Sequence, residues 1–439
     1  MVRPLLPHCD SLDPITFGKN GSQRCELNND GKPRFSRDEL TLLVILFSAT
    51  VIVATGIQMG SALFPALSRL LGVPVSIVTL LTSVWAFTGL VSPLFGPASD
   101  RYGHGNFALI GLGAFVLGNL LCAVAKSFSV LLVFQVVVGL GYAVFGFSGS
   151  AVVGDVFAYD MRARAMSVVR IAVSVSALAG VPAAAAIAER ATARGSFAAV
   201  GGLGLAVLVV ALMVLPKSSG ERVHASSTET HVGSWRTIVD IVRQRSARAA
   251  LLAILGWAAI PTGVFIYLAA WLERTFGLTE TQIGLAFSLV GVGALIGNAL
   301  TAAWTDRLGK KRATVLGLLL LSVTTVLLSR SPVLAAALVG LVVFTAALEF
   351  SFASFSTLMT ELVPSGRGTL MSLVSLSNGI GTGAVPLLMR PLWESQGYGA
   401  VTAVLGVIGL GTVALVGLFV TERQPSMPAS QPEEQASLG

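Results

Sequence analysis

Long apolar stretches alternate with short polar gaps along the chain from about residue 40 to about residue 420. A helix needs about 20 apolar residues to cross the hydrocarbon core of a bilayer, and each stretch is about that long. The pattern predicts an all-α integral membrane protein with twelve spanning helices, and the gaps leave no room for a globular domain between them. The expected spans are roughly 40–65, 75–97, 107–125, 129–153, 167–188, 197–215, 249–271, 282–303, 313–329, 333–358, 369–392 and 400–420.

Two polar segments flank these spans, and a third polar segment divides them into two groups of six. The first residues lack the apolar core of a signal peptide, and the last are low in complexity. The central segment is rich in Ser and Thr and ends in an expected amphipathic helix. We therefore expect a disordered tail over 1–39, a six-helix bundle over 40–215, a linker over 216–248, a second bundle over 249–420 and a disordered tail over 421–439.

Composition agrees with a lipid solvent. The chain is 54% hydrophobic and 12% charged, whereas a soluble domain carries about 25% charged residues. A net charge of +7 would suggest nucleic acid in a soluble protein, but here it indicates basic loops on one membrane face, and no nucleic-acid partner is expected. The three cysteines form no metal-binding or disulfide pattern.

Lys and Arg are unevenly shared between the two sets of loops. With the two tails and Arg170 set aside, one set holds fourteen of them and the opposite set, which includes Arg69, holds seven. Basic loops face the cytoplasm. The bias predicts a multi-pass protein of the cytoplasmic (inner) membrane with both termini in the cytoplasm.

The two groups of spans also share landmarks, which return 204 to 206 residues later. Asp100-Arg101 returns as Asp306-Arg307, and Asp155 is matched by Glu361. "AMS" at 165–167 is matched by "LMS" at 370–372, and Val181-Pro182 by Val385-Pro386. The spacing predicts two six-helix halves in parallel repeat. Such halves place a substrate site between them near the middle of the membrane.

At this point the chain resembles the major facilitator superfamily. "GPASDRYGHGN" is similar to the loop motif that follows the second span in that family, and "AAWTDRLGKKR" is similar to its copy in the second half. His104 and Gly105 stand where a basic pair is usual, and Ala302 replaces the first Gly of the second copy. The resemblance implies two pseudo-symmetric bundles that work by alternating access, usually as a monomer.

The resemblance also implies a gate latch at the cytoplasmic ends. Gly96 would permit close backbone approach and Gly103 a tight turn. The Asp100 carboxylate would lie near the start of the eleventh span, where a helix N-terminus favours negative charge. Arg101 or a neighbouring cation would meet Asp155. The second copy supplies Asp306, Arg307, Gly309, Glu361 and Arg367. The alternative is a solvated turn with positive-inside charge.

The fifth span carries Gly180 and Pro182 in "AGVPAAAAIAER", which resembles the Gly-Pro signature of proton-linked antiporters. Its surroundings are similar to drug and arabinose efflux permeases. The alternative is a proline kink with small residues for packing, a use that also fits Pro386.

Candidate substrate contacts come from the first and fourth spans. Gln135 stands where antiporters of this family often carry Arg, and Gln58, Phe64 and Tyr142 are further candidates. Apolar walls with few polar anchors suit lipophilic compounds. The alternative for each is a hydrogen bond between helices or packing.

Two charges lie inside spans. Arg170 is about one turn from the inner end of the fifth span and is expected to snorkel or to meet Asp160. Glu349 is the only carboxylate well inside any expected span, and the tenth span lines the cavity in the family. We expect Glu349 to carry the coupled proton and to contact substrate. The alternative is a structural acid bonded to Ser351 or Ser354.

Together these patterns predict a secondary transporter that exports a small lipophilic, drug-like or sugar-like compound. Its expected partners are the substrate, protons and the bilayer. No cofactor is expected, and the proton gradient is the expected energy source. An uptake symporter, a facilitative uniporter and a non-transporting receptor are the alternatives. An enzyme is not expected, because the sequence lacks GxSxG, HExxH and P-loop motifs.

Overall fold

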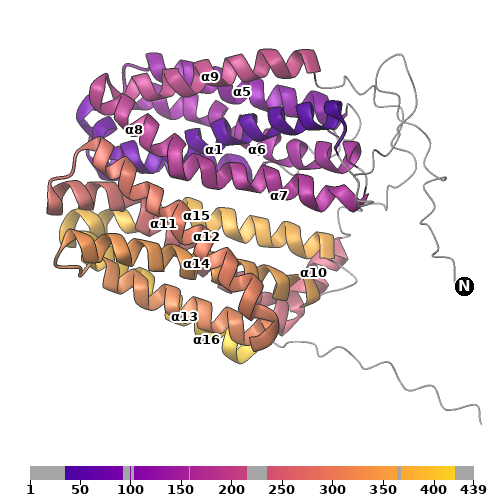
Figure 1. Cartoon of the computed structure of the whole chain (residues 1–439). Coiled ribbons are helices and arrows are strands. Elements are labelled where there is room, and N and C mark those ends of the chain that lie inside the picture. The colour runs from indigo at the N-terminus through magenta and orange to yellow at the C-terminus, as the bar shows by residue number, and fades with distance from the viewer. Residues whose placement is uncertain are drawn as a thin grey trace, which may run out of the picture.

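The computed structural model describes residues 35–91, 103–157, 159–214, 235–362 and 367–420, together with Ser99. Every regular element in these ranges is a helix (Figure 1). The first half comprises α1 (Arg37–Leu71), α2 (Val75–Val78), α3 (Leu80–Gly89), α5 (His104–Val124), α6 (Phe128–Val156), α7 (Tyr159–Val175), the π-helical turn η1 (Ser176–Gly180), α8 (Val181–Arg190) and α9 (Ala193–Val214). The second half comprises α11 (Arg245–Phe276), α12 (Glu280–Leu308), α13 (Lys310–Leu328), α14 (Leu334–Leu362), α15 (Arg367–Gln396) and α16 (Tyr398–Phe419), and α10 (Trp235–Arg243) precedes it.

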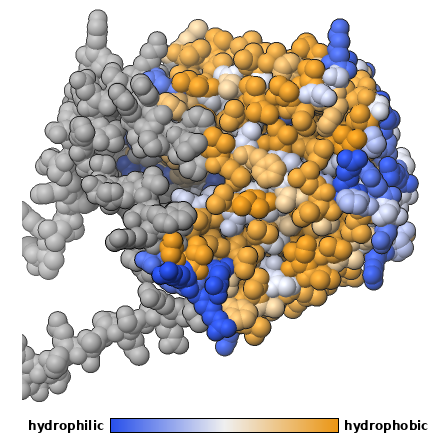
Figure 2. Space-filling model, turned by 180° about the vertical axis from the view of Figure 1, so that it is seen from behind, coloured by the Kyte–Doolittle hydropathy of each residue, from blue (hydrophilic) through white to orange (hydrophobic). Residues whose placement is uncertain are grey.

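The predicted all-α membrane fold is confirmed. Eleven spans among the described residues are long and apolar enough to cross a membrane, and a shorter apolar segment, Val75–Gly89, covers the described part of the expected second span. The rest of that span lies outside the described residues. Figure 2 shows a broad hydrophobic surface over the middle of the helices, with hydrophilic residues gathered toward its two ends.

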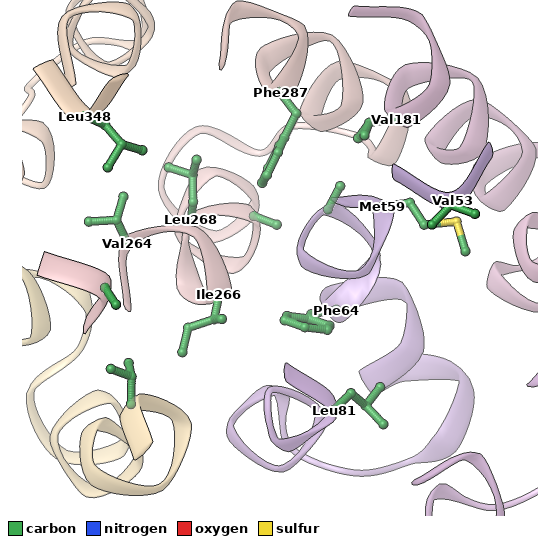
Figure 3. Packing of buried hydrophobic residues seen from close by; sticks show 14 of the residues in the cluster. Val53, Met59, Phe64, Leu81, Val181, Val264, Ile266, Leu268, Phe287 and Leu348 are labelled. Carbon is green, nitrogen blue, oxygen red and sulfur yellow. The ribbon is translucent and has the colours of Figure 1, made fainter. Parts of the chain in front are cut away.

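The halves lie side by side, with α1 and α5–α9 in one group and α11–α16 in the other (Figure 1). In the first half α5 packs on α6 and α9, and in the second half α13 packs on α14 and α16. Buried apolar residues form a cluster that runs through both halves. Figure 3 shows Phe64 of α1 close to Ile266 of α11 in this cluster.

The repeat is also visible in the backbone. Gly72 ends α1 with φ 65° and Gly277 ends α11 with φ 67°. Gly103 precedes α5 with φ 90° and Gly309 precedes α13 with φ 81°. Positive φ favours glycine because it lacks a Cβ atom. The paired glycines stand 205 and 206 positions apart, so equivalent turns recur at equivalent places.

Two ends of the bundle can be distinguished. At one end α1 begins beside the end of α6, where Phe35 packs on Phe157, and α11 begins beside the end of α16, where Arg245 lies over Phe419. We call this the N/C end, because α1 starts and α16 finishes there. The opposite end, where α1 and α11 finish, we call the far end.

Local sequence explains several helix starts. Ser36 and Glu39 form a capping box at α1, and Thr279 and Gln282 form one at α12. Each box satisfies backbone N–H groups that the first helical turn leaves unpaired. The linker predicted over 216–248 contains α10, whose buried Ile241 packs with Leu370 of α15.

Candidate functional site

Two hydrogen bonds join the halves between the far end and the middle of the bundle, and the repeat relates them. Ser83 Oγ of α3 donates to the Gly383 carbonyl of α15 at 2.7 Å. Ser288 Oγ of α12 donates to the Leu178 carbonyl of η1 at 3.1 Å. Ser288 and Gly383 stand 205 positions after Ser83 and Leu178, so the two bonds are pseudo-symmetric. They mark the interface on which the halves meet.

Pro182 explains why the Leu178 carbonyl is available. Proline has no N–H group, so it cannot donate to the carbonyl four residues earlier. The chain accommodates this as a π-helical turn, in which the Val181 N–H bonds to the Ser176 carbonyl. Gly180 lies in the same turn, and a Cβ built on it would come within 2.1 Å of Thr55 Oγ1 of α1. The Gly-Pro segment therefore combines a π turn with close helix packing.

Glycines also bring the two halves close. A Cβ on Gly284 of α12 would lie 2.6 Å from the Ala185 Cβ and 3.0 Å from the Pro182 Cα. A Cβ on Gly383 of α15 would lie 2.6 Å from Phe87 of α3. Small residues of this kind allow membrane helices to approach each other. A side chain at Gly284 would meet backbone and Cβ atoms and would separate the halves, whereas a side chain at Gly383 would displace the Phe87 ring.

The far end carries a second pair of symmetric contacts. Ser76 Oγ, in the first turn of α2, donates to Glu394 Oε1 of α15 at 2.5 Å. The Thr281 N–H, in the first turn of α12, donates to Glu189 Oε2 of α8 at 2.7 Å. Thr281 and Glu394 stand 205 positions after Ser76 and Glu189. In both cases an acid of one half meets a helix N-terminus of the other half, where negative charge is favoured.

Arg69 completes this far-end contact set. Its guanidinium forms ion pairs with Glu273 of α11 and Glu280 of α12, so one cation of the first half bridges two acids of the second half. We call the contacts of Ser76–Glu394, Glu189–Thr281 and Arg69–Glu273–Glu280 the far-end latch. The halves are therefore joined at the far end in this structure.

Several residues of the predicted inner latch cannot be placed. Gly96, Asp100 and Arg101 lie outside the described residues. Asp306, Glu361 and Arg367 belong to α12, α14 and α15, but only their backbones are described. Arg307 is exposed at the end of α12.

The inner-latch residues that are described lie at the N/C end. His104 Nε2 is 4.0 Å from Asp155 Oδ2, and Ser99 Oγ lies 2.9 Å from His104 Nδ1. The Asp155 carboxylate thus faces the imidazole that replaces a usual base of the motif. Gly103 and Gly309 supply the positive-φ turns already described.

The four candidate substrate contacts are separated. Gln58 Nε2 donates to Ser176 Oγ of η1 at 2.6 Å, and Phe64 is buried in the core. Gln135 is buried, and its Oε1 accepts from the Cys122 thiol of α5 at 3.5 Å. Tyr142 is the most accessible of the four and packs edge-on against Trp85 of α3.

Glu349 lies on the face of α14 that meets α12, and a Cβ built on Gly297 of α12 would lie 2.8 Å from the Glu349 Cβ. The carboxylate takes part in none of the hydrogen bonds or 4 Å ion pairs found between described residues. Its expected partners are engaged elsewhere. Ser351 accepts from Trp257 Nε1 at 3.0 Å, and Ser354 lies 3.2 Å from Thr305.

Arg170 is exposed on α7, which is compatible with the expected snorkelling, and its charge also acts on the Glu349 carboxylate of the opposite half. The alternative partner, Asp160, has its side chain outside the described residues. The far-end latch was missed, although the 205-residue spacing of Glu189 and Glu394 was a readable signal.

Comparison with known proteins agrees with this geometry. The chain matches the Major Facilitator Superfamily over residues 46–271 and again over residues 262–439. The chain belongs to this superfamily. The first match covers the first half and runs into α11, and the second continues from within α11 through the second half. The protein is therefore a multi-pass membrane transporter rather than an enzyme, and its substrate is a small molecule.

Curated relatives cover most of the chain. The inner membrane transport protein YdhP of Escherichia coli K12 is 27% identical over 376 residues, which is 83% of this chain and 91% of that protein. A chloramphenicol resistance protein of Streptomyces lividans is 28% identical over 373 residues, which is 80% of this chain and 92% of that protein.

Solved structures share the superfamily fold. A D-xylose–proton symporter superposes with a TM-score of 0.71 at 15% identity and covers 87% of this chain and 98% of its own. A peptide transporter superposes with a TM-score of 0.70 at 16% identity and covers 86% and 94%. At these identities the likeness supports the fold alone.

Proposed function

We propose that this transporter exports a small lipophilic, drug-like compound in exchange for protons, and that Glu349 carries the proton. The supporting observation is the position of Glu349, partly exposed inside a span, beside α12 and within electrostatic range of Arg170 of the other half. The protein would lie in the cytoplasmic membrane as a monomer, with the N/C end in the cytoplasm.

Because Glu349 lies inside a spanning helix, its ionised form is costly and protonation is favoured. A charged side chain at the centre of a spanning helix costs about 2.5–3.5 kcal/mol on insertion scales. A proton on the carboxylate removes that charge. One side chain can then hold either a proton or a polar group of the substrate, which is the competition that exchange requires.

The contacts between the halves support alternating access. The ion pairs of the far-end latch join exposed or half-buried groups, which separate at a small free-energy cost. The close packing at Gly284 and Gly383 involves no covalent bond between the halves, so it does not prevent them from separating. Breaking the far-end latch while the N/C end closes would carry the site from one side of the membrane to the other.

The substrate class rests on a relative. The Streptomyces lividans protein is named for resistance to chloramphenicol, a neutral aromatic amide. The accessible aromatic rings of Tyr142 and of Phe352, which stacks on Trp257 at 5.0 Å, suit a compound of this kind. Chloramphenicol is therefore the first probe to test.

The test uses purified protein in proteoliposomes with an imposed pH gradient and labelled chloramphenicol. The wild type should accumulate the compound in the more acidic compartment, and Glu349→Gln, which mimics the protonated acid, should abolish accumulation while exchange at equal pH persists. Asp240→Asn is the control, because it removes an exposed carboxylate of α10 outside the spans.

The alternatives give other results. Full gradient-driven accumulation by a folded Glu349→Gln variant would remove Glu349 from coupling. Accumulation in the alkaline compartment would indicate a symporter, and flux that ignores the gradient would indicate a uniporter. Binding without any flux would indicate a receptor.

A further inference from the structure

The contacts between the fifth and eighth spans fix the level of Arg170 in the membrane. Glu189 meets Thr281, Ala185 meets Gly284, and Leu178 meets Gly291. Steps of four and then seven residues back along the fifth span match steps of three and then seven residues forward along α12, so the two helices run antiparallel in nearly constant register. Arg170 lies eight residues, or about two turns, back from Leu178, and eight residues forward from Gly291 is Ala299, the neighbour of Asn298.

The neighbouring contact places Glu349 at this level too. Gly297 precedes Asn298 on α12, and its backbone lies against the Glu349 Cβ of α14. Arg170, Asn298 and Glu349 therefore come from three helices and two halves but share one depth. The electrostatic effect of Arg170 on the Glu349 carboxylate agrees with this placement.

All three side chains have polar atoms free for a ligand. Arg170 and Asn298 are exposed, and Glu349 is partly exposed. Asn298 Nδ2 donates to the Ala294 carbonyl of its own helix at 2.9 Å, and its amide oxygen accepts no hydrogen bond from the described residues. Arg170 and Glu349 form no ion pair within 4 Å in the described part of the chain.

The chemistry of this cluster selects among ligands. A guanidinium only donates hydrogen bonds, and an ionised carboxylate only accepts them. A neutral compound with both hydroxyl or amide donors and carbonyl or nitro acceptors can satisfy both groups. A lipophilic cation attracted to Glu349 meets the like charge of Arg170, and in a site of low dielectric constant that repulsion is strong.

We propose that Arg170, assisted by Asn298, is the specificity residue that makes the site accept neutral compounds with both donors and acceptors and reject lipophilic cations. This inference rests on the proposed function only in placing substrate at Glu349. It adds selection against cationic substrates, which the assignment of Glu349 as proton carrier does not explain. A carboxylate with no nearby positive charge would favour cations.

The experiment measures equilibrium binding of two probes to the full chain in lipid nanodiscs, with no gradient. The probes are tetraphenylphosphonium, a lipophilic cation, and chloramphenicol. The wild type should bind chloramphenicol and bind tetraphenylphosphonium weakly. Arg170→Gln should raise affinity for tetraphenylphosphonium at least tenfold, and Arg170→Lys, which keeps the charge, should leave it low.

Two further variants make the result specific. Arg170→Gln with Glu349→Gln should lose the gain, because the acid that attracts the cation is gone. Arg164→Gln removes a charge from an exposed position of the same helix and should leave cation affinity unchanged. Arg170→Met provides a second uncharged replacement.

The proposal is overturned if tetraphenylphosphonium binds the wild type as well as it binds both uncharged variants. It is also overturned if the gain persists without Glu349, or if Arg164→Gln gives an equal gain. Because no gradient is present, failure of proton coupling would leave these binding results intact, and the two proposals fail separately.

Discussion

Arg69 is the cation shared by Glu273 and Glu280 at the far end, and replacing it with Gln should loosen that end. The variant removes both ion pairs of the far-end latch and leaves two acids of the second half without their partner. The side chain of Arg69 is 50% exposed and those of the acids are 33% and 21% exposed, so solvent screens each pair.

The magnitude follows from this exposure. An exposed pair contributes about 0.2–1 kcal/mol, so two pairs contribute about 0.4–2 kcal/mol. With about 1.4 kcal/mol for each tenfold change, the ratio of open to closed far ends should rise roughly 2- to 30-fold. Arg274 is the matched control, since it stands 205 positions after Arg69 but lies over the Trp393 ring of its own half.

The assay is a distance distribution between spin labels on Thr192 and Thr275, two exposed far-end positions in opposite halves. The native cysteines at 9, 25 and 122 are first replaced. Arg69→Gln should add a longer-distance population that Arg274→Gln does not add. If Arg69→Gln leaves the distribution unchanged, or if Arg274→Gln widens it equally, the ion pairs do not hold the halves together.

Two further predictions concern packing and topology. Gly284→Leu places a side chain against Pro182 and Ala185, so it should hold the far end open and sharply reduce transport. The opening should appear as increased labelling, by an impermeant thiol reagent, of a cysteine introduced at residue 185. Unchanged labelling would contradict the packing argument. Reporter fusions after Pro216 and after Thr421 should both read cytoplasmic, because six and twelve crossings return the chain to its starting side; a reading from the other side at either point would contradict the proposed orientation.

The spans and their repeat were predictable because both are local properties of the sequence. Apolar length indicates each span, and the return of Asp100 and Pro182 after 204 to 206 residues indicates the two halves. The turn at Gly103 was predictable for the same reason, since its positive φ depends on a single residue.

The contacts between the halves were harder to predict because they depend on register. Arg170 shares the level of Glu349 only because the fifth span and α12 pack antiparallel at a particular height, which no local pattern specifies. Gln135 shows the converse case, because its position in the fourth span suggested a substrate contact, whereas its rotation places it against Cys122 of α5.

The far-end latch was predictable from the sequence in part. Ser76 and Thr281, like Glu189 and Glu394, occupy equivalent places in the repeat, and their pairing follows from the pseudo-symmetry of the halves. A search of the repeat for recurring acids at span ends would have found the two glutamates. Their partners follow once the halves face each other.

The central claim is that the two halves rock, so that the far end opens as the N/C end closes. The most direct measurement records both ends in one set of nanodisc samples, with labels on Thr192 and Thr275 for the far end and on Arg162 and Arg312 for the N/C end, all exposed positions. When pH or chloramphenicol concentration is changed, a longer far-end distance should appear together with a shorter N/C-end distance, in matching proportions. Distances that change in the same direction at both ends, or at one end only, would contradict the account.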